Sequence, residues 1–159
     1  MLHFSKVVLV TSVLGLAMIG PALAGETYFI IKSEKGEFAV TEDVVAKLKQ
    51  TEFKSELSDL DEETHVVKGP LLRDLIAASG ATGQTITAIA ADEYKADIPV
   101  SDTTSYDVIV AVSMDGKPLT VDENGPARIL YPVLDNPKLK DDEAVAARAV
   151  FQLKELDVK

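Results

Sequence analysis

Residues 63–80 read ETHVVKGPLLRDLIAASG and predict a short strand followed directly by a short helix. Residues 63–68 have the alternating polarity typical of a strand. Pro70 favours the first position of a helix, because its missing N–H costs nothing there. Gly80 favours the end of that helix. Its expected buried stripe is Leu71, Leu72, Leu75 and Ile76.

The chain on both sides of this stretch mixes strands with short helices. Upstream, Lys35-Gly36 predicts a hairpin turn, and Thr41 predicts the N-cap of a helix that runs to Lys49. The other expected strands are residues 28–32, 37–40, 53–58, 85–90, 94–100, 108–114, 129–131 and 150–158. The pattern predicts one strand-rich α+β domain with short peripheral helices.

Composition restricts the class of protein. The 159 residues suit one domain, and 26 acidic against 16 basic side chains give a net charge of −10. This balance argues against nucleic-acid binding, which needs basic patches that face phosphates. The sequence has no cysteine, which excludes disulfides, cysteine-ligated zinc or iron–sulfur sites and a thiol nucleophile.

Residues 1–24 have the form of a secretory signal peptide. Lys6 precedes an apolar run over residues 7–19, and Pro21-Ala22-Leu23-Ala24 ends in a small-x-small cleavage pattern. Cleavage after Ala24 would leave a domain of residues 25–159 in the periplasm. Only one charge, that of Lys6, is lost, so the net charge would become −11. An uncleaved anchor is the alternative, although the run is shorter than the roughly 20 residues that a span needs.

Common catalytic patterns have little support. The only histidine after the signal peptide, His65, lies in an alternating segment and is expected to be a surface or half-buried residue. The acidic cluster of Asp59, Asp61, Glu62 and Glu63 lacks the spacing of a calcium loop and is expected to be solvated. The sequence has no phosphate-binding glycine-rich loop and no Gly-x-Ser-x-Gly turn.

Polar and aromatic residues gather near the C-terminus. Pro132 and Pro137 bracket a loop that carries Asp135 and Asn136, and on a continuous strand Arg148 and Gln152 would share one face. Such planar and forked polar groups beside aromatic rings suit a flat heterocycle. The alternative is that residues 135–137 form only a turn and that Arg148 pairs with one of the surplus acids.

Several segments together resemble the molybdopterin-binding domain of the sulfite oxidase family. They are residues 68–76, 92–94, 114–119, 125–132, 135–136 and 148–152. The resemblance implies the sulfite oxidase-like fold, a strand-rich mixed sheet with short helices. Enzymes of the family hold molybdenum through a cysteine thiolate, which this chain lacks, so the resemblance implies pterin binding without a metal rather than redox catalysis.

The resemblance also implies roles for individual residues in binding a pterin. Asp135 would accept hydrogen bonds from the amino edge, Arg148 would donate to the carbonyl edge, and Tyr131 or Phe151 would stack on the ring. The remaining candidates are Tyr94, Asn136, Gln152 and, less centrally, Arg128.

The sequence is most similar to small periplasmic pterin-responsive proteins that control an inner-membrane enzyme of cyclic di-GMP synthesis or degradation. The expected function is therefore a non-enzymatic pterin sensor whose partner is the periplasmic sensor domain of that enzyme. The alternatives are a molybdopterin-dependent oxidoreductase that holds its metal without cysteine, or an accessory subunit.

Overall fold

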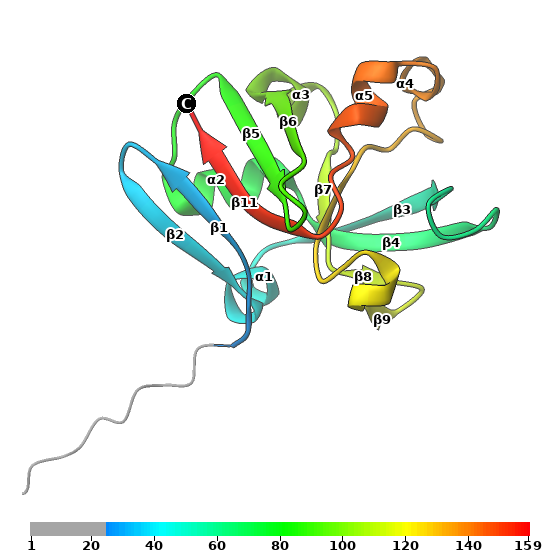
Figure 1. The fold of residues 1–159 in the computed structure, drawn as a ribbon, viewed down its shortest axis with the longest axis horizontal. Coiled ribbons are helices and arrows are strands. Elements are labelled where there is room, and N and C mark those ends of the chain that lie inside the picture. Colours follow the sequence, from blue (N-terminus) through cyan, green and yellow to red (C-terminus); the bar gives the residue numbers. More distant parts are fainter. Residues whose placement is uncertain (1–24) are drawn as a thin grey trace, which may run out of the picture.

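A computed structural model describes residues 25–159 of the protein (Figure 1). The expected signal peptide, residues 1–24, lies outside the described residues. No helix within residues 25–159 is both long enough and apolar enough to cross a membrane.

A five-stranded sheet forms one side of the molecule (Figure 1). Strand β1 runs parallel to β11, and every other neighbouring pair in this sheet is antiparallel. The predicted mixed sheet is thereby confirmed. In spatial order the strands are β2 (Gly36–Thr41), β1 (Thr27–Ser33), β11 (Leu153–Val158), β5 (Thr85–Ala90) and β6 (Lys95–Pro99).

Helices α1 (Glu42–Lys47) and α2 (Leu72–Ser79) confirm the two expected helices. The hydroxyl of Thr41 caps α1, as predicted. Helix α2 begins later than predicted, because Pro70 still belongs to the preceding strand. Gly80 ends α2 in the left-handed conformation, with φ of 70°, which a glycine adopts at little cost.

A second sheet projects from the first and consists of β3 (Gln50–Glu56), β4 (Thr64–Pro70), β8 (Ser113–Met114) and β9 (Lys117–Pro118) (Figure 1). Strands β7 (Ile109–Ala111) and β10 (Arg128–Leu130) form a separate pair. The predicted strand 108–114 is therefore split into β7, which pairs with β10, and β8, which pairs with β4. Gly69 lets β4 pass against this region, because a Cβ there would lie 1.9 Å from the carbonyl oxygen of Val110.

The main core joins the five-stranded sheet to α2. Ile31, Ile86 and Leu156 of the sheet and Leu72 and Leu75 of the helix belong to one buried cluster. A second cluster under the projecting sheet includes Phe53, Val67, Ile109 and Leu130. The α+β class is confirmed.

The chain after β6 differs from the prediction. Helices α3 (Val100–Ser105), α4 (Pro137–Lys140) and α5 (Glu143–Arg148), with the 3-10 turn η1 (Val121–Glu123), were not expected. The last strand begins at Leu153 rather than at residue 150. The carboxylate of Asp142 accepts hydrogen bonds from the backbone N–H groups of Ala144 and Val145 and so starts α5, in a segment for which the sequence predicted no element.

Candidate ligand-binding site

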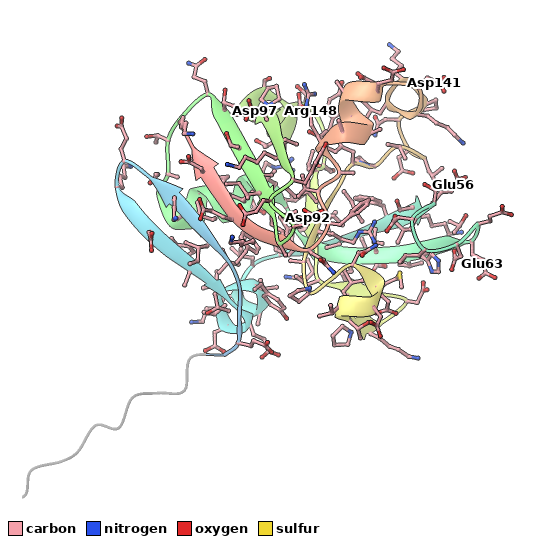
Figure 2. All side chains as sticks on the ribbon, in the orientation of Figure 1. Glu56, Glu63, Asp92, Asp97, Asp141 and Arg148 are labelled. Carbon is pink, nitrogen blue, oxygen red and sulfur yellow. The ribbon has the colours of Figure 1, made fainter. Side chains whose placement is uncertain are left out.

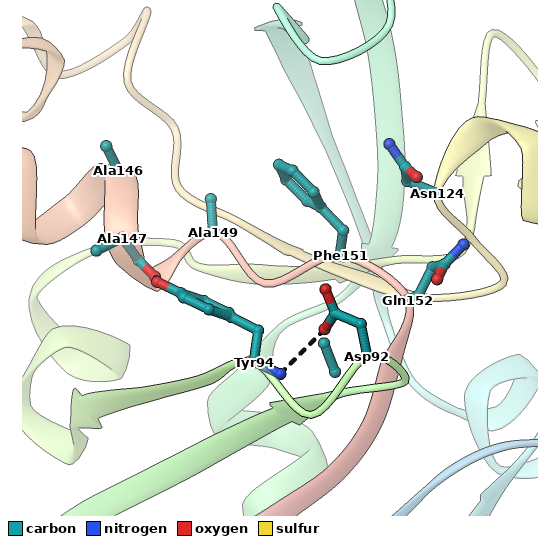
Figure 3. Close-up of a pocket in the computed structure, with 9 residues that line it drawn as sticks. Asp92, Tyr94, Asn124, Ala146, Ala147, Ala149, Phe151 and Gln152 are labelled. Atoms are coloured by element: carbon teal, nitrogen blue, oxygen red, sulfur yellow. Dashed lines mark hydrogen bonds between the residues drawn. The ribbon is translucent and has the colours of Figure 1, made fainter.

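Two cavities meet at Phe151. The first has a volume of about 330 Å³ and includes Tyr94 and Gln152, and the second has a volume of about 300 Å³ and includes Arg128. We call them the Tyr94 cavity and the Arg128 cavity. Ala146, Ala149 and Phe151 line both, so helix α5 and the segment before β11 form their common wall. Figure 3 shows Phe151 extending between Ala149 and Asn124.

Arg128 is the central polar residue of the second cavity and is fully buried. Its guanidinium carbon lies 4.3 Å from the centre of the Phe151 ring, which is a cation–π contact. One terminal nitrogen donates to Asp59 Oδ1 at 2.9 Å, and the other donates to the carbonyl oxygen of Glu123 at 3.3 Å. The buried Nε finds no acceptor among residues 25–159. Nε is therefore the one guanidinium nitrogen without a hydrogen-bond partner among the described residues.

Asp59 holds this guanidinium in place. Its second oxygen accepts a hydrogen bond from the side-chain amide of Asn124 at 2.8 Å. Burial alone would raise the pKa of Asp59, but the hydrogen bonds from Arg128 and Asn124 and the guanidinium charge hold it below its usual value. The acidic cluster is exposed, as expected, but Asp59 is not merely solvated, because it pairs with Arg128 across 69 positions of sequence.

The rest of the Arg128 cavity is mostly apolar. Its apolar wall comes from Leu57, Leu130, Val133, Leu139 and Val145. The only other charged lining residues are Glu56 and Lys140, which lie 3.5 Å apart in an exposed ion pair. An apolar cavity with few polar groups is typical of a site for a flat organic molecule.

Tyr131 contributes its ring to this cavity, but its hydroxyl is occupied. The hydroxyl donates to Asp102 Oδ2 at 2.8 Å. Burial, with the hydrogen bond to Asp102, raises the pKa of Tyr131 far above its usual value. The phenol therefore stays neutral and serves as an apolar wall.

The Tyr94 cavity brings together three of the residues that the sequence predicted. The Tyr94 hydroxyl donates to the carbonyl oxygen of Ala147 at 2.8 Å, and its backbone N–H donates to Asp92 at 3.0 Å (Figure 3). The side-chain amide of Gln152 donates to the carbonyl oxygen of Val121 at 3.3 Å. Tyr94, Phe151 and Gln152 thus line one cavity.

Arg148 lies apart from both cavities. It is the last residue of α5 and not a strand residue, so the prediction that it shares a strand face with Gln152 is wrong. Its guanidinium donates to Asp102 Oδ2 at 2.9 Å and to the carbonyl oxygen of Asp97 at 3.2 Å. Arg148 and Asp97 lie next to each other in Figure 2. The alternative interpretation, in which Arg148 pairs with an acid, agrees with this geometry.

Asp135 and Asn136 line a different cleft, together with Phe53, Tyr106 and Asp107. The side-chain amide of Asn136 donates to the carbonyl oxygen of Pro132 at 3.0 Å. The structure therefore does not bring these two residues together with Phe151. Five of the eight predicted residues line the Tyr94 cavity or the Arg128 cavity, and Asp135, Asn136 and Arg148 line neither.

His65 is buried, which differs from the expected surface or half-buried position. One ring nitrogen lies 2.8 Å from Asp115 Oδ2 and the other lies 2.9 Å from Asp61 Oδ1. Both nitrogens can donate only in the imidazolium form. The hydrogen bonds to Asp115 and Asp61 raise the pKa of His65. Asp61, like Asp59, is thus a structural residue of the β3–β4 loop and not merely a solvated acid.

Sequence analysis missed Asp59 and Asn124 as residues of the site. Two apolar residues, Leu57 and Leu60, flank Asp59 and pack in the second core cluster. This apolar pair could have indicated that the loop packs against the rest of the protein. Asn124 follows η1 with a positive φ of 59°, a conformation that asparagine tolerates better than most residues.

Comparison with known proteins places the chain in a family. The family described as the oxidoreductase molybdopterin binding domain matches residues 47–135. This match covers more than half of the chain, so the protein belongs to that family, and the resemblance in the sequence is confirmed. The matched range includes Arg128 and Asp59 but ends before α5 and Phe151.

A solved relative supports the fold. The sulfane dehydrogenase SoxCD from Paracoccus pantotrophus matches with a TM-score of 0.62 and 16% sequence identity. The match covers 83% of this chain but only 38% of the SoxCD chain, and at this identity it supports the fold alone. No curated protein matches the chain.

The side chains fit a pterin better than the molybdenum centre of the family. The sequence offers no thiolate, and residues 25–159 contain no group of three or more His, Cys, Asp or Glu that could hold a metal ion. In contrast, the aromatic ring of Phe151 and the guanidinium of Arg128, whose buried Nε has no acceptor, both belong to residues that line the Arg128 cavity. A thiolate-held molybdenum does not fit these residues.

Proposed function

We propose that this protein is a periplasmic pterin-binding protein without enzymatic activity, and that the pterin occupies the cavities that meet at Phe151. The single observation that carries the proposal is the buried Nε of Arg128, which has no acceptor, on a residue that lines a cavity and lies within the matched molybdopterin-binding domain. A pterin offers a flat ring for aromatic contact and a carbonyl oxygen and ring nitrogens that accept hydrogen bonds.

The energetic argument rests on burial. A buried N–H group without an acceptor costs about 1–3 kcal/mol, so a ligand that brings an acceptor removes this cost on binding. The contact with Phe151 and the hydrogen bond to Asp59 hold the guanidinium in one orientation. The site is thereby preorganised, which reduces the entropy that binding loses.

The test is a calorimetric titration with 6-hydroxymethylpterin. Arg128→Lys keeps a positive charge opposite Asp59 but removes the Nε donor and the planar group on Phe151. We expect affinity to fall about tenfold or more, which corresponds to one lost hydrogen bond of roughly 1.4 kcal/mol. The matched control is Arg73→Lys, because Arg73 forms an exposed ion pair with Asp107 and lines neither cavity. Equal affinities for wild type and Arg128→Lys would place the ligand elsewhere.

The second candidate function, favoured by family membership, is a molybdopterin-dependent oxidoreductase or its accessory subunit. The absence of cysteine from the sequence is the reason that we prefer the binding protein. Metal analysis of protein purified from the periplasm distinguishes the two, because stoichiometric molybdenum would favour the oxidoreductase.

We further propose that ligand occupancy is relayed to the periplasmic sensor domain of a membrane-bound cyclic di-GMP enzyme. This proposal rests on the sequence resemblance and on the net charge of −10, which suits a basic receiving surface. A pull-down of the mature protein with the sensor domain, with and without pterin, tests it. Failure to retain the domain at low salt would favour a free-standing pterin carrier.

A further inference from the structure

The charges around Phe151 are balanced within the protein. Arg128 and Asp59 form a 2.9 Å pair in which the guanidinium is almost completely buried. Lys140 is paired with Glu56 at the exposed side of the same cavity. The Tyr94 cavity adds one more charged lining residue, Asp92, which is acidic. Together the two cavities therefore carry one negative charge in excess.

Two cations close in sequence to the lining residues also have acidic partners. Arg148 is held by Asp102, and Lys154 is paired with Glu93. In the part of the chain that the structure describes, no lysine or arginine other than Arg128 and Lys140 lines either cavity. A ligand in these cavities thus meets no arginine or lysine charge that lacks an acidic partner.

A phosphate monoester would fit such a site poorly. It carries nearly two negative charges at neutral pH and needs several donors or a free cation in exchange for its water shell. Proteins usually supply these from unpaired arginines or from backbone N–H groups at a helix start. Here the carboxylate of Asp59 already neutralises the guanidinium charge of Arg128.

We infer that the site selects an uncharged pterin without a phosphate group, and that Asp59 determines this selectivity by neutralising Arg128. The inference rests on the proposed pterin-binding function and names the chemical class of its ligand. Asp59, which itself lines the Arg128 cavity, acts by neutralising Arg128 and is therefore a specificity-determining residue.

The experiment compares two ligands with the same ring, 6-hydroxymethylpterin and its phosphate monoester, by calorimetric titration at fixed ionic strength. Wild type should bind the uncharged pterin at least about tenfold more tightly. Asp59→Asn keeps an oxygen acceptor for Arg128 but removes the negative charge, so the preference should shrink severalfold or reverse. Glu62→Gln is the matched control: it changes the net charge equally on the same loop, lines neither cavity and should leave the preference unchanged.

The outcomes separate the two proposals. Binding of both ligands with equal affinity, or tighter binding of the phosphate ester, by wild type would overturn the inference and leave pterin binding intact. Binding of neither ligand would refute the proposed function and this inference with it. If Asp59→Asn does not fold, the wild-type preference alone decides between these results.

Discussion

Replacing Asp59 with alanine removes the carboxylate that faces an almost fully buried guanidinium. The side chain of Arg128 is 1% exposed and that of Asp59 is 20% exposed. Loss of one partner of a buried ion pair costs about 3–5 kcal/mol, because the other charge remains buried. Since Asp59 retains some contact with solvent, which screens the pair, we expect a loss of about 2–4 kcal/mol.

The assay is urea denaturation followed by circular dichroism. The control is Asp107→Ala, which removes an exposed partner of Arg73 and should cost less than about 1 kcal/mol. The double variant Asp59→Leu with Arg128→Met replaces both charges with apolar groups and should be more stable than Asp59→Ala alone. A free energy of unfolding for Asp59→Ala within about 0.5 kcal/mol of wild type would refute the reasoning, because that is the size of an ordinary surface effect.

The pH dependence of the same pair has a definite sign. The pKa of Asp59 is lowered in the folded protein, so the pair stabilises the fold above the unfolded-state pKa of about 3.9. This contribution is lost as the pH falls through the folded-state pKa. The difference in stability between wild type and Asp59→Ala should therefore shrink in acid.

The remaining predictions concern His65, Gly69 and the N-terminus. Because the pKa of His65 is raised, its stabilising effect is complete below about pH 6.5 and is lost as the pH rises through the folded-state value. The difference in Tm between wild type and His65→Gln should thus narrow from about pH 5 to about pH 9, and a constant difference would contradict this account. Gly69→Ala places a Cβ 1.9 Å from the carbonyl oxygen of Val110 and should cost about 3 kcal/mol or more in urea denaturation. Protein isolated from the periplasm should begin at Gly25 by mass spectrometry, and a chain that retains Met1 would contradict cleavage.

The elements that the sequence predicted correctly are determined by residues close to one another in the sequence. Thr41 starts α1 and Gly80 ends α2 through contacts with residues in the adjacent helical turn. Polar and apolar residues alternate along strands such as β5, and this alternation can be recognised in the sequence. The helices α3 and α4 are too short for their hydrophobic period to stand out. Helix α5 had a local signal in Asp142 and its alanines, but the apolar residues after Arg148 favoured a longer last strand.

The candidate site was predicted only in part, because its decisive contacts are long-range. Tyr94, Phe151 and Gln152 were recognised as members of one set, and the structure brings them together. The pairing of Arg128 with Asp59 joins β10 to the β3–β4 loop, and nothing in local periodicity selects one acid among 26 as its partner. The same limitation affected Arg148, whose acidic partner Asp102 lies on an unpredicted helix.

The β3–β4 loop connects the acidic composition of the chain to the site. The carboxylate of Asp59 accepts a hydrogen bond from the guanidinium of Arg128. Two residues later, the carboxylate of Asp61 lies in hydrogen-bond contact with the imidazole of His65. The loop is thus held to the rest of the protein by two of its carboxylates. These contacts place three carboxylates, those of Asp59, Asp61 and Asp115, against two cations, so most of the 26 acidic side chains lie outside them. The unpaired acids therefore remain available to solvent. The internal pairs make the cavity nearly neutral, while the remaining acids suit a basic partner surface, so ligand selection and partner attraction can rest on separate sets of carboxylates.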